Sequence, residues 1–386
     1  MSRQSDQDSR TRTVRAGLET DPHTGAVVPP IHLSSTYAFP RFGEKGRYDY
    51  SRSGNPTRDL LAEALADLEG GAGAVVTASG MAAIALCAQP LPSRARIVAP
   101  HDCYGGTHRL LSAWQRRGDF EVQFVDYADE RALSSALSRP AALVWIETPS
   151  NPLLRITDIS AVSALAHAAG ALVAVDNTFL SPVWQTPLSL GADLVIHSTT
   201  KYLNGHSDVI GGAVIARQAE LHQQLAWWAN ATGVTGAAFD SFLTLRGLRS
   251  LHARLAVHEQ NATTLASWLS DQPKVSRVLY PGLASHPGHE LARRQQRGFG
   301  AMISLELEGG ATSVQRFVAG LQLFSLAESL GGVESLIAHP ATMTHAAMTA
   351  EARQSAGISE GLVRLSVGIE ASEDLRRDLA AGLERV

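Results

Sequence analysis

The chain of 386 residues has few cysteines, few lysines and no long apolar run, and each scarcity excludes a class of protein. Its two cysteines, Cys87 and Cys103, are too few for a disulfide framework and lack the spacing of a zinc site, so we expect both to be reduced. No apolar segment approaches the roughly 18 residues that a membrane span needs, and the polar N-terminus lacks the apolar core of a signal peptide. We therefore expect a cytoplasmic protein with no membrane partner.

The charge balance limits the partners further. Charged residues make up 18% of the chain and the formal net charge is -4, without a polybasic stretch, so nothing indicates nucleic acid as a partner and small-molecule substrates are favoured. Only Lys45, Lys201 and Lys274 are lysines, which leaves arginine to supply 30 of the 33 basic residues. A lysine in a chemically suggestive setting is therefore informative.

The middle of the chain has the pattern of an α/β domain. From about residue 60 to residue 216, short apolar runs alternate with helical patterns, as in a buried and mostly parallel sheet. Asp158 is expected to begin a helix that Gly170 ends, which gives a β-α-β unit. Five strands are predicted, at residues 95–100, 141–149, 172–178, 193–198 and 211–216.

The two ends of the chain differ from this middle part. Residues 303–308 and 363–368 alternate apolar with polar side chains, which predicts a half-exposed antiparallel sheet in a smaller C-terminal α+β domain. The N-terminal segment contains Pro29, Pro30 and Pro40 without sustained periodicity, which indicates an extended arm. We therefore expect an arm at residues 1–59, a large domain at 60–255 and a small domain at 256–386.

Two residues at the ends of predicted strands suggest a cofactor. Lys201 follows a buried-strand pattern, and a partly desolvated amine at that edge can act as a Schiff-base nucleophile. Asp176 ends another strand and could keep a pyridine nitrogen protonated, which makes the ring an electron sink for carbanions. Taken singly, Lys201 could be a surface lysine and Asp176 a helix cap. Together they indicate pyridoxal phosphate.

A phosphate would need hydrogen-bond donors near this pair. Gly80 and Met81 begin a predicted helix whose amides can face an anion, and Ser198 and Thr200 could add hydroxyls. The alternative for the first of these segments is a serine cap on a core helix.

Two further side chains are candidates for ring and substrate binding. Tyr104 follows another predicted strand and could stack on an aromatic ring, or it could be an ordinary turn residue. Arg364 lies on the polar face of residues 363–368, where its guanidinium could bind a substrate carboxylate through two hydrogen bonds or could simply be solvated.

Three other functions fit the residues less well. A nicotinamide-dependent dehydrogenase shares the α/β pattern, but residues 70–76 have valine at the last glycine position of GxGxxG. A metal site at His286–Glu290 conflicts with our interpretation of that segment as an exposed loop. A non-catalytic binding or scaffold protein would need no lysine in the setting of Lys201.

Eight motifs occur in order along the chain: SRSGNPTR, ASGMAA, HDCYGG, ETPSNPLL, VDNTF, HSTTKYLNGHSD, SLAESLGGVESL and RLSVGIE. Together they resemble the Cys/Met-metabolism family of pyridoxal-phosphate enzymes, from about Thr13 to the C-terminus. The resemblance implies a fold-type I, aspartate-aminotransferase-like α/β architecture. It also implies a homotetramer built from two dimers, with active sites at the interface within each dimer.

The resemblance also assigns roles to individual residues. It implies that Lys201 binds pyridoxal 5'-phosphate covalently, that Asp176 pairs with the pyridine nitrogen and that Tyr104 stacks on the ring. It implies that the phosphate is bound by Gly80, Met81, Ser198 and Thr200, with Tyr50 and Arg52 reaching in from the neighbouring subunit. It implies that the substrate carboxylate is bound by Arg364, Ser329 and Asn151. It also implies that Glu328 is an acid that accompanies γ-carbon chemistry. No metal is implied.

Within the family, residues 226–251 and 299–310 resemble the branch that joins O-succinyl-L-homoserine, or its O-acetyl analogue, to L-cysteine and so forms L-cystathionine. We therefore expect this γ-replacement, with Lys201 and Tyr104 as catalytic residues. Ser53 follows Arg52 at a position where enterobacterial members of that branch have a second arginine and the cystathionine-cleaving branch has serine. Cleavage of L-cystathionine to cysteine, 2-oxobutyrate and ammonia is the alternative.

Overall fold

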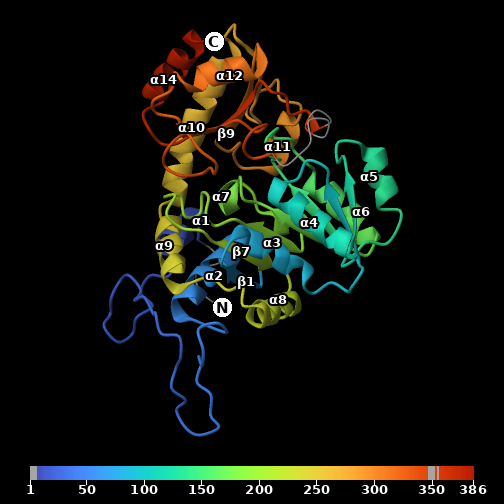
Figure 1. The fold of residues 1–386 in the computed structure, drawn as a ribbon. Helices are drawn as coiled ribbons and strands as arrows, with labels where there is room; N and C mark the ends of the chain where they lie inside the picture. Colours follow the sequence, from blue (N-terminus) through green and yellow to red (C-terminus); the bar gives the residue numbers. More distant parts are fainter. Residues whose placement is uncertain (1–6, 347–352, 354–355) are drawn as a thin grey trace.

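The computed structural model describes residues 7–346, 353 and 356–386, which form two sheets with helices packed around them (Figure 1). The larger sheet has the order β1-β7-β6-β5-β4-β2-β3. Strands β6, β5, β4, β2 and β3 run parallel, whereas β7 is antiparallel to both of its neighbours. The predicted, mostly parallel sheet is therefore confirmed. Its strands are β1 (Gly73–Thr77), β2 (Arg96–Pro100), β3 (Glu121–Val125), β4 (Leu143–Glu147), β5 (Leu172–Asp176), β6 (Leu194–His197) and β7 (Gly212–Ala216).

All five strands predicted for the large sheet are present, and two of its strands, β1 and β3, were missed. Strand β1 was missed because its apolar run is only a few residues long and follows a glycine-rich segment. Strand β3 was missed because it lies at the outer edge of the sheet and alternates Glu121 and Gln123 with apolar residues. The predicted β-α-β helix is α6 (Ile159–Ala168): Asp158 accepts a hydrogen bond from the Ala161 amide at 2.9 Å. Gly170 follows this helix with a φ of 77°, which glycine adopts without strain.

Both faces of the large sheet are buried because its central strands are apolar on both sides. Helices α2 (Pro56–Glu69) and α6 contribute to the core on one face, and α3 (Gly80–Ala88) and α8 (Ala219–Thr232) to the core on the other. Each fully buried aliphatic side chain contributes about 1.5–3 kcal/mol relative to an exposed one. The position of the strand ends is therefore fixed by many such side chains.

The smaller sheet has the order β10-β11-β12-β9-β8 and is antiparallel except for the β10·β11 pair. The predicted antiparallel pairing is confirmed, but the prediction of a half-exposed sheet is wrong for the two predicted strands: all residues of β12 (Leu362–Ser366) are buried, and in β9 (Met302–Leu307) only Glu306 is not. Val363 and Leu365 pack into the core, while Arg364 turns to a cavity between the two sheets. The other strands are β8 (Val275–Leu279), β10 (Ser325–Leu326) and β11 (Leu336–Ala338).

The long helix α10 (Leu251–Ser270) runs from the large sheet towards the small one (Figure 1). The predicted domain limits fall within α2 and within α10, and that division stays a prediction. The N-terminal segment after α1 (Ser9–Arg15) projects from the body in two loops (Figure 1). The remaining helices are α4 (Gly105–Arg117), α5 (Glu130–Ala136), α7 (Ser181–Trp184), η1 (Pro187–Leu190), α9 (Ala238–Leu248), α11 (His289–Gln295), α12 (Gly310–Val318) and α14 (Ser372–Glu384).

Some expectations about single segments can be checked directly. Cys87 and Cys103 are both free and buried. The segment from His286 to Glu290 is an exposed loop only in part: Pro287 and Glu290 are exposed, but His286 is buried and its Nδ1 accepts a hydrogen bond from the Gly288 amide at 3.0 Å. Across the described residues, no helix combines the length and the apolar character needed to cross a membrane.

Candidate active site

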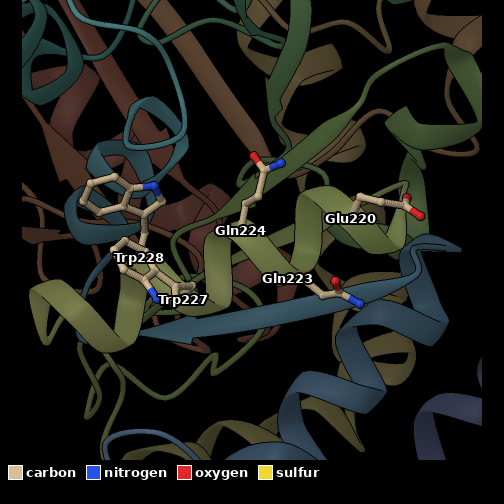
Figure 2. A pocket seen from close by; sticks show the side chains of 5 residues that line it. All are labelled: Glu220, Gln223, Gln224, Trp227 and Trp228. Atoms are coloured by element: carbon tan, nitrogen blue, oxygen red, sulfur yellow. The ribbon is translucent and has the colours of Figure 1, made fainter.

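A cavity of about 1390 Å³ lies at the carboxyl ends of the parallel strands and is closed on its other side by residues of the small sheet. This is where open α/β sheets bind ligands. Of the thirteen predicted site residues, eleven line it: Gly80, Met81, Tyr104, Asn151, Asp176, Ser198, Thr200, Lys201, Glu328, Ser329 and Arg364. A smaller hollow on α8, lined by Glu220, Gln223, Gln224, Trp227 and Trp228, contains none of them (Figure 2).

Lys201 lies in the turn after β6, and its Nζ donates a hydrogen bond to the Ser329 hydroxyl at 2.6 Å. Burial lowers the pKa of Lys201 to about 8, and the positive charge of Arg364 acts in the same direction. At pH 7.5 that pKa leaves roughly a quarter of the amines neutral, against about 0.1% for an ordinary lysine. The next residue, Tyr202, is fully buried and holds the turn by edge contacts with Trp184 and His258.

Ser329 presents its hydroxyl to Lys201 from a strained backbone. Its φ is 91°, in a region that residues with a side chain rarely adopt, and such strain is concentrated at functional sites. Arg364 stabilises this conformation because its Nη2 donates to the Ser329 carbonyl oxygen at 2.8 Å. The lysine, the serine and the arginine therefore form one connected unit.

Arg364 is a buried cation that is only partly satisfied. Its Nη1 donates to the Asn151 side-chain oxygen at 2.9 Å, whereas its Nε has no hydrogen-bond partner. Burial lowers the pKa of Arg364 to about 10. In the described part of the chain no carboxylate lies within ion-pair distance of it. A buried guanidinium facing a cavity is well suited to bind a carboxylate from a ligand.

Two carboxyl groups lie at the floor of the cavity. Asp176 ends β5, and its Oδ1 accepts a hydrogen bond from the Thr178 amide at 3.0 Å. Burial raises the pKa of Asp176, while the hydrogen bonds from Thr178 and the charge of His197 lower it. Glu147 ends β4 and pairs in register with Asp176. Burial raises the pKa of Glu147 to about 8, and the negative charge of Asp176 contributes to that rise.

The start of helix α3 lies against the turn that carries Lys201. Ser79 caps the helix by accepting a hydrogen bond from the Ala82 amide at 3.1 Å. A Cβ atom on Gly80 would lie 2.8 Å from the Cβ of Ser198, so glycine is required for this close approach. The first amides of a helix have no partner within it and favour an anion. The Thr200 hydroxyl fixes the turn itself, since it bonds both the amide and the carbonyl of Gly211.

Tyr50 and Arg52 are the two predicted site residues that do not line the cavity of their own chain. Both lie in the N-terminal segment before α2, where Tyr50 is exposed and Arg52 donates to the backbone and side-chain oxygens of Asn230 in α8 at 2.7 and 3.0 Å. Their predicted contact with a neighbouring subunit stays a prediction.

The cavity also contains residues that the sequence reasoning missed. Glu147 is the most consequential, and its signal was available: the buried strand LVWIE ends in a carboxylate, as LVAVD does at Asp176. His345 was missed too. It is buried in the cavity wall, where burial and Arg364 lower its pKa to about 4, and no strand pattern marks its segment.

The residues present fit pyridoxal phosphate. The cavity combines an amine of lowered pKa, a carboxylate at the end of the adjacent strand and a glycine-lined helix start that can receive an anion. An amine of this kind can form a Schiff base and transfer protons. Among the described residues no group of three or more His, Cys, Asp or Glu side chains is arranged to hold a metal ion.

Comparison with known proteins agrees with this chemistry. The chain is 57% identical to the cystathionine gamma-synthase of Escherichia coli K12 over 96% of its length and 97% of the relative. It is 48% identical to a cystathionine beta-lyase of Coxiella burnetii and 45% identical to a cystathionine gamma-lyase of Dictyostelium discoideum, with 97% of each chain covered in both cases.

Solved structures and a family model give the same result. The crystal structure of cystathionine gamma synthase from Xanthomonas oryzae pv. oryzae in complex with aminoacrylate and cysteine is 62% identical, with a TM-score of 0.97 over 98% of each chain. The model for "Cys/Met metabolism PLP-dependent enzyme" matches residues 10–384. The chain therefore belongs to the Cys/Met metabolism family of PLP-dependent enzymes, with the fold-type I architecture of that family and pyridoxal 5'-phosphate as its cofactor.

Proposed function

We propose that this enzyme catalyses γ-replacement, in which O-succinyl-L-homoserine, or its O-acetyl analogue, reacts with L-cysteine to give L-cystathionine and succinate or acetate. The observation that carries the proposal is the unit of Arg364, Ser329 and Lys201, in which a buried cation bonds the carbonyl oxygen of the same serine whose hydroxyl bonds the catalytic amine. A substrate carboxylate bound by Arg364 would bring the substrate Cα close to Lys201. The identities of 57% and 62% to the γ-synthases of Escherichia coli and Xanthomonas oryzae, against 48% and 45% to the β-lyase and γ-lyase named above, support replacement over cleavage.

The roles of the residues follow from their positions. The bound cofactor supplies an electron sink for a carbanion at the substrate Cα. Lys201, once free, removes the proton at Cα and later one at Cβ, and its lowered pKa keeps a useful fraction of it neutral. Asn151 and Ser329 hold Arg364 in the orientation that receives the carboxylate.

Three further cavity residues complete the proposed site. Asp176 keeps the pyridine nitrogen protonated, and Tyr104 stacks on the ring and helps to deprotonate the incoming thiol. Glu328 lies beside the unit formed by Arg364 and Lys201, and its charge acts on the pKa of both. We assign it to the region where the γ-carboxylate leaves.

We also propose that the enzyme is a homotetramer of two dimers, in which the N-terminal segment of one subunit completes the cavity of its partner. The segment projects from its own body (Figure 1) and exposes large apolar side chains. Phe42 is fully exposed and Leu33 is 73% exposed, which is typical of a surface that is covered on assembly. In such an assembly Tyr50 and Arg52 can reach a partner's phosphate group.

One observation favours cleavage of L-cystathionine as a second candidate function. Ser53 occupies the position after Arg52, and its hydroxyl donates to the Asp49 carboxylate at 2.8 Å. The chain therefore has no second arginine there to bind the distal carboxylate of a succinyl group. Its relative in Dictyostelium discoideum is named a gamma-lyase.

Product analysis separates the two functions. The purified holoenzyme is incubated with O-succinyl-L-homoserine plus L-cysteine in one reaction and with L-cystathionine alone in another. We expect cystathionine to form in the first reaction faster than 2-oxobutyrate forms in the second. A cleavage rate that exceeds the replacement rate would reverse the assignment.

A further inference from the structure

Glu147 is a second carboxyl group on the cavity floor that the proposed reaction does not use. It lies opposite Asp176 in the pairing of β4 with β5. Two residues earlier, Trp145 and Ala174 pack into the same core cluster, so Glu147 and Asp176 extend from the same face of the sheet. Both line the cavity. Because neighbouring strands lie about 4.8 Å apart, two such carboxyl groups are close neighbours.

The groups that face Glu147 do not include a compensating cation. Asp176 faces it from β5, Cys103 and the Tyr104 amide face it from the segment before α4, and the Trp145 indole faces it from its own strand. His197 acts on Asp176 and pairs with Glu69 at 2.6 Å. Within the described residues no Lys, Arg or His forms an ion pair with Glu147. In the cofactor-free chain, two adjacent carboxyl groups without a cation cannot both ionise readily.

Glu147 also holds the backbone of the tyrosine that we assign to the cofactor ring. Its Oε2 accepts a hydrogen bond from the Tyr104 amide at 2.6 Å, and its Oε1 accepts one from the Trp145 indole at 2.9 Å. Tyr104 is the residue before α4, and its side chain makes no capping hydrogen bond to the helix. The conformation at the start of α4 therefore depends on the contact with Glu147.

We propose that Glu147 is a positioning residue that fixes Tyr104 through its amide and faces Asp176 as an uncharged carboxylic acid, so that Asp176 alone carries negative charge opposite the ring nitrogen. This inference rests on the proposed roles of Asp176 and Tyr104. It assigns the single proton of the carboxyl pair to Glu147. Burial and the negative charge of Asp176 raise the pKa of Glu147 to about 8 and outweigh the hydrogen bonds from the Trp145 indole and the Tyr104 amide, which lower it; this is consistent with the assignment. Hydrogen bonds from Thr178 favour the ionised form of Asp176.

Two substitutions separate the hydrogen bond from the charge. Glu147→Gln keeps the size of the side chain and one oxygen that can accept from the Tyr104 amide, but it cannot ionise, and its NH2 group leaves the Trp145 indole N–H without an acceptor. Glu147→Leu removes the acceptor and leaves two buried N–H groups unpaired. Asp176→Asn serves as the matched control on the adjacent strand, since it removes the charge that we place opposite the ring nitrogen.

The readouts are the visible absorbance and visible circular dichroism of the bound cofactor, recorded from pH 6 to pH 10 without an amino-acid substrate. At pH 7 we expect Glu147→Gln to match the wild type in both spectra. At alkaline pH the wild type should show a spectral change, from ionisation of Glu147, that Glu147→Gln lacks. Glu147→Leu should weaken the dichroism at every pH and release cofactor about tenfold faster. Asp176→Asn should alter the absorbance at every pH.

Three results would overturn the inference. Glu147→Gln could resemble Asp176→Asn at pH 7, which would mean that Glu147 acts as a charged group. The alkaline change could be identical in wild type and Glu147→Gln, which would mean that Glu147 does not titrate there. A soluble, folded Glu147→Leu could keep the wild-type dichroism, which would exclude the positioning role. Because no amino-acid substrate is present, none of these results depends on whether the enzyme replaces or cleaves.

Discussion

Replacing Arg364 by lysine tests how the cavity binds its substrate. The substitution keeps a positive charge but removes the planar fork that donates to Asn151 and to the carbonyl oxygen of Ser329. An ammonium group cannot bond those two oxygens and a substrate carboxylate with the same geometry.

The size of the effect can be estimated from these contacts. A hydrogen bond to a charged group is worth about 1.5–3 kcal/mol, so loss of two such bonds to the substrate corresponds to about 3–6 kcal/mol. That free energy lowers kcat/KM for O-succinyl-L-homoserine by roughly 10²- to 10⁴-fold. Part of the effect should appear in kcat, because Ser329 would no longer be held against Lys201.

The assay measures kcat and KM for the acylated homoserine at saturating cysteine in the wild type, in Arg364→Lys and in the control Arg316→Lys. Arg316 lies exposed on α12, away from the cavity, and its substitution should change neither constant by more than about twofold. Wild-type kcat/KM in Arg364→Lys would refute the assignment of the carboxylate site.

Two further predictions concern Ser329 and Lys201. Ser329→Gly and Ser329→Ala should both lower kcat, because each loses the 2.6 Å hydrogen bond to Lys201. The glycine variant should be more stable than the alanine variant by about 1–2 kcal/mol, because the φ of 91° suits glycine. Equal unfolding free energies of the two variants in denaturant titration would contradict the backbone strain. In cofactor-free protein, the pKa of Lys201 is about 8 when folded and near 10.5 when unfolded, so the unfolded chain binds more protons between these values and stability rises with pH there. Lys201→Met should therefore raise the unfolding free energy of the cofactor-free protein by about 1–3 kcal/mol at pH 7, and this increase should shrink as the pH rises from 8 to 10.5. An increase that does not change with pH would contradict a buried charge on Lys201.

Several residues at the floor of the cavity could be predicted from the sequence, because parallel strands place their carboxyl ends at one edge of the sheet. Lys201 and Asp176 were found in this way, and the same rule would have found Glu147 if the acidic end of LVWIE had been considered. Its interaction with Tyr104 could not be predicted, because hydrogen bonds between distant segments leave no periodic signal.

Other features depend on tertiary packing that a local pattern does not contain. The alternation in β12 correctly placed Val363 and Leu365 inward, but Arg364 on the opposite face is buried by the cavity wall instead of being solvated. The surroundings of Tyr50 and Arg52 in an assembly cannot be derived from one chain.

The central claim is that one amine, that of Lys201, carries the cofactor, and the small number of lysines makes it directly testable. The yellow holoenzyme is reduced with borohydride, digested, and mapped by mass spectrometry for the peptide that carries the pyridoxyl phosphate. The account predicts a single modified residue, Lys201. Modification of Lys45 or Lys274 in its place, or no modified peptide at all, would contradict it.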